Sequence, residues 1–188
     1  MPYPSKLSSE TLVEVAWQMM EDEGVESFSM HKLAAHFKVK TASLYRYYKK
    51  AELLRAVNAY TEAKLYQAIT PPLQTDDNPT QIIYQITINY REFALAHPTT
   101  YGLMYTNTID ELRPDFEDGV QEVIPFQVLI SNLSGDENSL SALRGLLALM
   151  HGFVMLEIAG QLRRGGSLAE AYRYTVDAYI QGIDNNDS

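Results

Sequence analysis

Two short helix patterns separated by a tight break constrain the fold of this chain more than any other feature of its sequence. The first pattern begins at Ser29, which can cap a helix. Its apolar face consists of Met30, Leu33, Ala34 and Phe37. The second pattern runs from Thr41 to about Tyr48, and its inner side is shared by Leu44, Tyr47 and Tyr48. The break around Val39 predicts that the two short helices are joined by a tight turn.

Longer helix patterns flank this pair. Ser8–Glu23 has apolar residues at the spacing of one helix face, and Gly24 follows it as a C-terminal cap. Ala51–Ile69 is predicted to form a helix that ends at Pro71-Pro72. One helix followed by two short helices and a tight turn is the arrangement of a helix-turn-helix unit. We therefore predict such a unit in residues 1–50 and a connecting helix in residues 51–70.

The remainder of the chain is also predicted to be helical, so the expected fold class is all-α. The prolines and polar residues of PPLQTDDNP, residues 71–79, cannot continue a helix, and we place a domain boundary there. Helix patterns then occupy residues 80–97, 101–105, 110–133, 139–162 and 168–183. Pro125 should kink or split the third of these. The β-branched run IIYQITI resembles a strand, but no neighbouring segment offers it a partner.

Charge is distributed unevenly along the chain. Residues 1–66 carry nine Lys and Arg against eight Asp and Glu, whereas residues 67–188 carry six against sixteen, and the formal net charge is −9. Between Ser27 and Ala51 there is no carboxylate. The cations of this segment are Lys32, Lys38, Lys40, Arg46, Lys49 and Lys50. A solvated helix face usually mixes the two signs, so this segment indicates a surface that meets a polyanion.

Double-stranded DNA accounts for the missing carboxylates. In a helix-turn-helix unit the second short helix lies in the major groove. A carboxylate there would face phosphate charge, whereas each Lys or Arg that neutralises a phosphate releases counterions and adds salt-dependent affinity. Tyrosine suits the same surface, because its ring packs while its hydroxyl can donate to a phosphate oxygen.

The motifs also resemble those of a known family. SMHKLAAHFKVKTASLYRYY, followed by AELLRAV, resembles the DNA-binding domain of TetR-family bacterial transcriptional regulators. ALRGLLALMHGFVMLEIAGQL resembles the His-Gly helix of the WHG-type subgroup of that family's C-terminal domains. The resemblance implies a helical effector-binding and dimerisation domain over residues 71–188. It further implies a repressor that binds a palindromic operator as a homodimer and is released by a small-molecule effector.

The chain departs from the family pattern at four places. Lys38 stands where the turn usually has Gly, and a positive φ there would cost on the order of 1 kcal/mol. Lys40 stands where a Ser commonly caps the third helix, and Leu147 replaces the subgroup's Trp. The connection after Tyr48 is one residue shorter than the common form. Either Lys49 or Lys50 could therefore be the phosphate-binding lysine.

The resemblance also implies DNA contacts, residue by residue. Thr41, Ala42 and Ser43 begin the recognition helix and are expected to face base edges, where Ala42 offers only apolar contact. Tyr47 occupies another contacting position, although a core role is the alternative because it shares a face with Leu44. The other expected DNA contacts are Ser29, His31, Lys32, Lys40, Tyr45, Arg46 and Lys49 or Lys50.

The second part is expected to bring two copies of the chain together. A palindromic site requires two helix-turn-helix units, one from each copy, which we call reading heads. The resemblance places the subunit interface on the last two long helices, roughly residues 140–162 and 168–183. Small residues there permit close approach of another backbone: Gly145, Ala148, Gly152, Ala159 and Gly160. Packing within one subunit is the alternative for these positions.

An effector pocket is implied by the resemblance, whereas composition alone favours an ordinary helical core. The candidate lining residues are Tyr84, Tyr90, Phe93, Tyr101, Met104, Tyr105, Phe126, Met150, His151 and Met155. His151 lies midway along an apolar helix, and Arg91 and Glu157 are alternative polar groups for such a site.

Other classes of protein find little support in the sequence. We expect no enzyme, because the chain has no Cys nucleophile, glycine-rich phosphate loop or nucleophile elbow. We also expect no cofactor or metal, since His31 and His36 point ~140° apart on one helix. A signal peptide and a membrane-spanning run are not expected either, which favours a cytoplasmic protein. The alternative function is a helical protein-protein adaptor.

Overall fold

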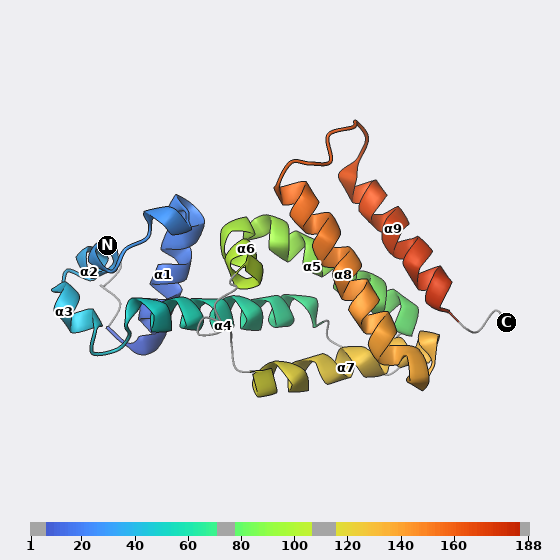
Figure 1. Ribbon diagram of the computed structural model, residues 1–188, viewed down its shortest axis with the longest axis horizontal. Helices are drawn as coiled ribbons and strands as arrows, with labels where there is room; N and C mark the ends of the chain where they lie inside the picture. Colours follow the sequence, from blue (N-terminus) through green and yellow to red (C-terminus); the bar gives the residue numbers. More distant parts are fainter. Residues whose placement is uncertain (1–6, 71–77, 107–115, 185–188) are drawn as a thin grey trace. The chain divides into compact units, whose positions relative to one another are not determined.

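The computed structural model describes residues 7–70, 78–106 and 116–184, excluding the side chains of residues 106 and 116–122. Every regular element within these ranges is a helix, which confirms the predicted all-α class (Figure 1). The proposed linker at residues 71–79 lies almost wholly outside the described residues. The chain forms two compact units. Unit 1 contains the described residues up to Lys64 and from His97 to Phe116, and unit 2 contains Leu65–Ala96 and those from Glu117 onward.

Helix α1 (Ser9–Glu23) begins and ends as its sequence predicts. The Ser8 hydroxyl accepts a hydrogen bond from the Thr11 amide, and the Thr11 hydroxyl accepts one from the Ser8 amide, at 3.2 and 3.0 Å. This reciprocal pair satisfies two amides that a helix start otherwise leaves without partners. At the other end, Gly24 has φ 83° and its amide donates to the Met20 carbonyl. A glycine permits this left-handed backbone at little cost.

The two short helices are α2 (Met30–His36) and α3 (Thr41–Leu44). The Ser29 hydroxyl caps α2 by accepting from the Lys32 amide at 3.2 Å, as predicted. The turn between the helices has Lys38 at φ 56°, the one non-glycine residue with positive φ in the described part of the chain. No side chain caps α3 at Lys40, and the helix is shorter than the predicted segment, which extended to Tyr48. The amides of Tyr47 and Tyr48 instead close turns on the Leu44 carbonyl.

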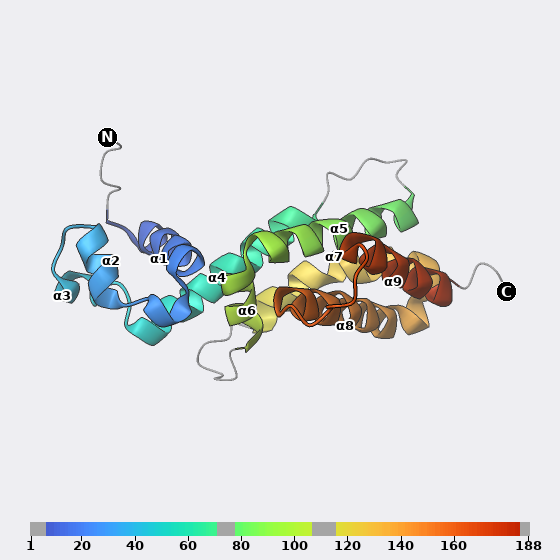
Figure 2. The same cartoon turned by 90° about the horizontal axis from the view of Figure 1, so that it is seen from above.

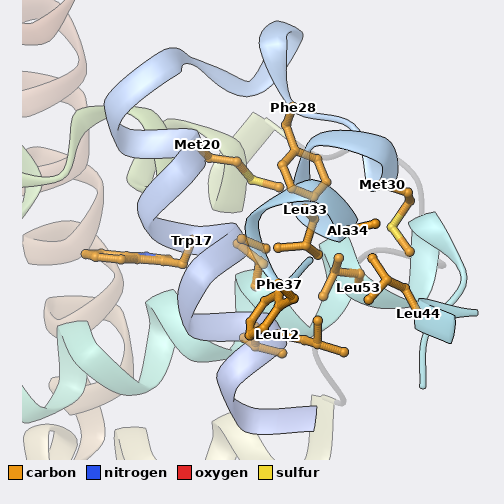
Figure 3. Packing of buried hydrophobic residues seen from close by; sticks show 13 residues of the cluster. Leu12, Trp17, Met20, Phe28, Met30, Leu33, Ala34, Phe37, Leu44 and Leu53 are labelled. Carbon is orange, nitrogen blue, oxygen red and sulfur yellow. The ribbon is translucent and has the colours of Figure 1, made fainter. Parts of the chain in front are cut away.

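One apolar core joins these helices to α1 and to the start of α4 (Lys50–Ile69) (Figure 3). Leu33 from α2, Leu44 from α3 and Leu53 from α4 are all fully buried in it. Burial of each such side chain contributes roughly 1.5–3 kcal/mol. The core fixes the direction in which α3 presents its remaining residues, because Leu44, the last residue of this single helical turn, is buried in it.

Helix α6 (Pro98–Thr106) belongs to unit 1, where it packs against α1. The Glu21 carboxylate accepts hydrogen bonds from the amides of Thr99 and Thr100, at 3.3 and 2.8 Å, and from the Thr100 hydroxyl. It thus serves amides at the start of α6, where a helix end also favours negative charge. Beside it, the Trp17 ring lies 4.8 Å from the His97 ring.

Unit 2 is built from α5 (Pro79–Ala96), α7 (Phe116–Ser134), α8 (Ser139–Ile158), α9 (Leu168–Ile183) and the end of α4. Helix α8 lies beside both α5 and α9 (Figures 1 and 2). The IIYQITI run is helical within α5, as the absence of a partner strand indicated. The helix α7 continues through Pro125, so the expected split does not occur there.

Glycine permits the close packing of α8 on α9. The Tyr179 hydroxyl donates to the Ala142 carbonyl at 2.8 Å, which places its ring directly against Gly145. A Cβ atom at Gly145 would lie 2.9 Å from Tyr179 Cζ and closer still to the hydroxyl oxygen. Gly145 therefore serves packing within one subunit, which was the alternative to a role in dimerisation.

Candidate nucleic-acid interface

Helix α3 and the turn after it present a row of exposed side chains. Leu44 is buried, whereas Lys40, Ala42, Tyr45 and Arg46 are exposed and Thr41 and Ser43 are half-buried. Tyr45 is 55% exposed, so much of its surface is available to a partner. The geometry therefore brings the predicted base-facing and phosphate-facing residues to one short segment anchored by a single leucine.

Tyr47 lies on the outside of this segment rather than on the inner side that its spacing with Leu44 predicted. Its side chain is 39% exposed, and its hydroxyl donates weakly to the Leu7 carbonyl at 3.4 Å. The reason is that α3 ends at Leu44, so the helical spacing used for the prediction does not continue to Tyr47. Tyr48 is half-buried and packs against the core, as predicted.

Two of the predicted cations already have carboxylate partners. Lys32 Nζ lies 2.7 Å from the Glu23 carboxylate, at the end of α1. Lys49 Nζ lies 3.9 Å from Glu52, whose carboxylate also accepts from the Lys49 amide at 2.7 Å. Both pairs are exposed and can open at small cost when phosphate competes. The segment between Ser27 and Ala51 contains no carboxylate, but the fold places the carboxylates of Glu23 and Glu52 beside it.

The other cations of the segment have no such partner within the described ranges. Lys38, Lys40, Arg46 and Lys50 are exposed, and no ion pair engages them there. Lys50 is the first residue of α4, directly after the turn that follows α3. Of the two lysines that the sequence left open, Lys50 is thus the one whose ammonium group is available in this structure.

Residues of α2 complete the surface. The Thr41 hydroxyl lies 3.4 Å from His31 Nδ1, which connects the exposed side of α2 to the start of α3. The Ser29 hydroxyl already accepts from the Lys32 amide, so it has only its own proton to offer a phosphate oxygen. The structure thereby brings His31 to the predicted DNA-facing residues and gives Ser29 a structural role in the same region.

Sequence reasoning missed the two carboxylates of this surface. Lys49 directly precedes α4, and Glu52 is the third residue of that helix. A carboxylate at this position commonly accepts from the amide of the residue before the helix, so the sequence could have predicted this cap. Lys32 and Glu23 are separated by nine residues and by a break in the helix pattern, so no spacing rule pairs them.

The predicted effector residues are divided between the two units. Tyr101, Met104 and Tyr105 belong to α6 in unit 1, and the others belong to unit 2. Four of the set are buried core side chains: Tyr90, Phe93, Tyr101 and Met150. Phe126 packs parallel to Tyr66, and His151 and Met155 are half-buried. Burial lowers the pKa of His151 below its ordinary value, so the ring favours its neutral form.

Tyr84 alone among that set lines a cleft found between α5 and α9 in the described part of unit 2. Arg91, named as an alternative polar group, also lines it and forms a half-buried ion pair with Glu157 of α8. No group of three or more His, Asp or Glu side chains within the described ranges is arranged to hold a metal ion.

The segment Asp136–Ile158, which includes α8, is long and apolar enough to cross a membrane by length and composition. This corrects the expectation of no such segment, which counted uninterrupted apolar residues and so was broken by Arg144 and His151. The core helix of a soluble protein meets the same criterion. Only 28% of the most apolar window is buried within this chain, however, so much of its surface is uncovered.

Comparisons with known proteins agree with this geometry. Residues 12–57 match the model of bacterial regulatory proteins of the tetR family, and residues 83–179 match the tetracyclin repressor-like C-terminal domain. The second match does not distinguish the WHG-type subgroup. An uncharacterized HTH-type transcriptional regulator of Bacillus subtilis (strain 168), YobS, is 21% identical over 94% of this chain and 93% of its own length.

Two solved structures show the same fold. A TetR variant from Acinetobacter baumannii AYE in complex with minocycline has a TM-score of 0.70 and 19% identity, covering 94% of this chain and 96% of its own. BioQ with its double-stranded DNA operator has a TM-score of 0.63 and 20% identity, covering 94% of this chain and 99% of its own. The helix-turn-helix geometry and the two family matches, which together span most of the sequence, make this chain a member of the TetR family of transcriptional regulators, a family without enzymatic activity.

Proposed function

We propose that this protein is a cytoplasmic repressor that binds a palindromic DNA operator as a homodimer and leaves it when a small-molecule effector binds residues 71–188. The observation that carries the proposal is the α3 surface. Arg46 and Lys50 are exposed cations without ion-pair partners in the described ranges, and Tyr45, beside Arg46 in the sequence, is exposed as well. Such a surface can neutralise phosphates while Thr41, Ala42 and Ser43 face base edges.

Dimerisation is supported by the exposed apolar side chains of α8 and α9. Leu140, Leu147 and Leu156 of α8 are each more than 40% exposed, and Tyr174 of α9 is 75% exposed. A monomer rarely leaves so many large apolar residues on one pair of helices, and a second copy would remove them from water. Two copies would also supply the two reading heads that a palindromic operator requires.

Effector release is supported by the relative that was solved with minocycline, which has the same fold over 94% of this chain. An effector that lowers operator affinity must itself bind more weakly to the DNA-bound protein, because the coupling free energy between two sites is reciprocal. Titrating candidate ligands into the protein with and without operator DNA therefore tests this part directly.

The DNA-binding test uses fluorescence anisotropy with DNA from the protein's own promoter region. We expect tight binding at low salt and a steep fall in affinity as salt rises. The double variant Arg46→Ala/Lys50→Ala should reduce the slope of log affinity against log salt by about 2 per reading head, since each lost phosphate contact removes about 0.9. Arg164→Ala removes an exposed cation from the α8–α9 connection and should leave the slope unchanged.

Two results would contradict the proposal. Absence of DNA retention at any salt concentration would favour the adaptor alternative. An unchanged slope for the double variant, with the protein folded by circular dichroism, would show that DNA binds elsewhere. Sequencing the retained fragments then tests whether the operator is palindromic.

A further inference from the structure

A cleft of about 390 Å³ opens between α5 and α9 of unit 2. This volume is in the range of small-molecule sites. The residues that give the cleft its chemistry are Tyr84, Arg91, Glu92, Tyr172, Arg173 and Asp177. The full lining falls at positions 84, 87, 88, 91 and 92 of α5 and 169, 172, 173, 176 and 177 of α9, so one face of each helix forms a wall.

The floor of the cleft is fixed by contacts that leave little freedom. Tyr172 is 3% exposed, and its hydroxyl donates to the Thr87 carbonyl at 2.9 Å. The Arg91 guanidinium lies 5.8 Å from the Tyr172 ring centre and donates from Nε and Nη2 to the two oxygens of Glu157, at 2.9 and 2.5 Å. Because both charges are largely buried and bonded to each other, the positive charge of Arg91 is offset at its own position.

The remaining charges of the cleft favour a cation. Glu92 and Asp177 contribute two carboxylates and Arg173 contributes one guanidinium, which leaves a net negative charge once Arg91 is paired. Burial, and hydrogen bonding to the Asp177 carboxylate, raise the pKa of Tyr84 to about 12, which keeps its phenol neutral. On the larger scale, residues 67–188 carry sixteen acids against six bases. A negative field of this extent raises the local concentration of cations.

We propose that this cleft binds a small organic cation with an aromatic or apolar body. The ammonium group would lie near Asp177 and Glu92, and the body would lie against Tyr84 and Tyr172. Aromatic rings attract such cations through their negative faces in addition to the apolar contact that they offer. An anionic ligand of the same shape would meet two carboxylates and should bind more weakly.

The cleft is separate from the surface proposed for dimerisation. The exposed apolar side chains assigned to that surface, Leu140, Leu147, Leu156 and Tyr174, are all absent from the lining of the cleft. A second copy that covers these four side chains therefore does not have to cover the cleft lining. The binding of a cation stands on the cleft alone, and its effect on DNA rests on the proposed function.

The test titrates the full-length protein with benzyltrimethylammonium by isothermal calorimetry, with benzenesulfonate as the anionic comparison. We expect the cation to bind with a millimolar or lower dissociation constant and the anion to bind at least about tenfold more weakly. Asp177→Asn should weaken cation binding about fivefold or more. Glu170→Gln, an exposed acid on α9 outside the cleft lining, is the matched control and should bind as the parent does.

No heat and no shift of Tyr84 resonances in nuclear magnetic resonance spectra up to about 10 mM cation would overturn the proposal. Equal binding of benzenesulfonate, or equal binding by a folded Asp177→Asn variant, would overturn it as well. Operator affinity is measured on the same samples without the probe. Intact DNA binding with failed cation binding sinks this inference alone, whereas failed DNA binding with intact cation binding sinks only the proposed function.

Discussion

The two units of the molecule leave different kinds of apolar side chain at their surfaces. Within the described residues, the large apolar side chains exposed in unit 1 are all tyrosines: Tyr45, Tyr47 and Tyr105. In unit 2 they are mostly aliphatic: Leu95, Ile124, Val128, Leu140, Leu147 and Leu156, together with Tyr174. A tyrosine joins an apolar ring to a hydroxyl that binds water or phosphate, whereas an exposed leucine gains only when another apolar surface covers it.

This difference indicates two kinds of partner. In unit 1 the core leucines Leu33, Leu44 and Leu53 are fully buried, and the exposed large side chains are tyrosines, which suit a hydrated polyanion such as DNA. Unit 2 leaves large apolar side chains of α8 uncovered within one chain: Leu140, Leu147 and Leu156. The units thus combine a surface suited to a wet interface with one suited to a dry interface, as expected for a dimer that binds DNA.

The largest expected effect comes from placing a charge on the exposed apolar side of α8. Leu147→Glu places a charge on the exposed side of α8, where it remains solvated in a monomer but loses its water in a dimer. We expect the dimer dissociation constant to rise by a factor of about 100 or more, measured by sedimentation equilibrium. Operator affinity should fall with it, because a single reading head contacts half of a palindrome.

Leu95→Glu on α5 and Val128→Glu on α7 serve as matched comparisons, since both side chains are exposed in unit 2. Leu95→Glu should leave the dimer intact. If Val128→Glu dissociates the dimer while Leu147→Glu does not, the second copy covers α7, and the interface assigned to the last two helices is wrong.

Packing within unit 2 is tested by Gly145→Ala. The added methyl group would overlap Tyr179, whose ring is held by its hydrogen bond to the Ala142 carbonyl. We expect a loss of about 1–3 kcal/mol in the free energy of unfolding, measured with urea. The second substitution Tyr179→Phe removes the closest atom and should restore part of the loss. Gly152→Ala meets no atom within 4 Å in the subunit, so a similar loss there would contradict this explanation.

The attachment of α6 within unit 1 is tested by Glu21→Gln. The neutral amide keeps the side-chain length but loses the charge that favours amides at the start of a helix. We expect a loss of about 1 kcal/mol in the free energy of unfolding of unit 1. Glu14→Gln, at an exposed position of the same helix, should change it by much less. Equal losses in the two variants would show that the α6 contact contributes nothing.

The smallest effect is expected for Lys38→Gly in the turn of the helix-turn-helix unit. Lys38 has φ 56°, which glycine adopts without the steric cost of a Cβ atom. We expect a gain of up to about 1 kcal/mol in the free energy of unfolding, seen as a small rise in melting temperature. A decrease would mean that the lysine side chain stabilises the turn by more than its backbone strain costs.

Local signals predicted the fold where they act within a few residues. Ser8, Gly24 and Ser29 cap the helices that they were expected to cap, because a cap depends only on the adjacent turn. The IIYQITI run was also placed correctly, since a strand without a neighbour cannot satisfy its backbone. The length of α3 was overestimated, because apolar spacing does not show where a one-turn helix stops.

Features that depend on contacts between distant segments were not predictable in the same way. The pairing of Lys32 with Glu23 and that of Arg91 with Glu157 join residues on different helices, so no spacing within one helix reveals them. The assignment of α6 to unit 1 follows from Glu21, which is 78 residues away from Thr99. The DNA-facing residues were found because a helix-turn-helix unit gathers them in one short stretch.

The chain contains a single tryptophan, Trp17, whose buried ring lies near His97 and Lys64 in unit 1. The centres of the His97 and Trp17 rings lie 4.8 Å apart, and the Lys64 ammonium lies 5.2 Å from the centre of the Trp17 ring. Indole emission is quenched by nearby protonated groups and shifts to the red when water enters. The tryptophan emission of this protein, excited where tyrosine does not absorb, therefore monitors the junction of α1, α4 and α6 without any label and without a contribution from unit 2.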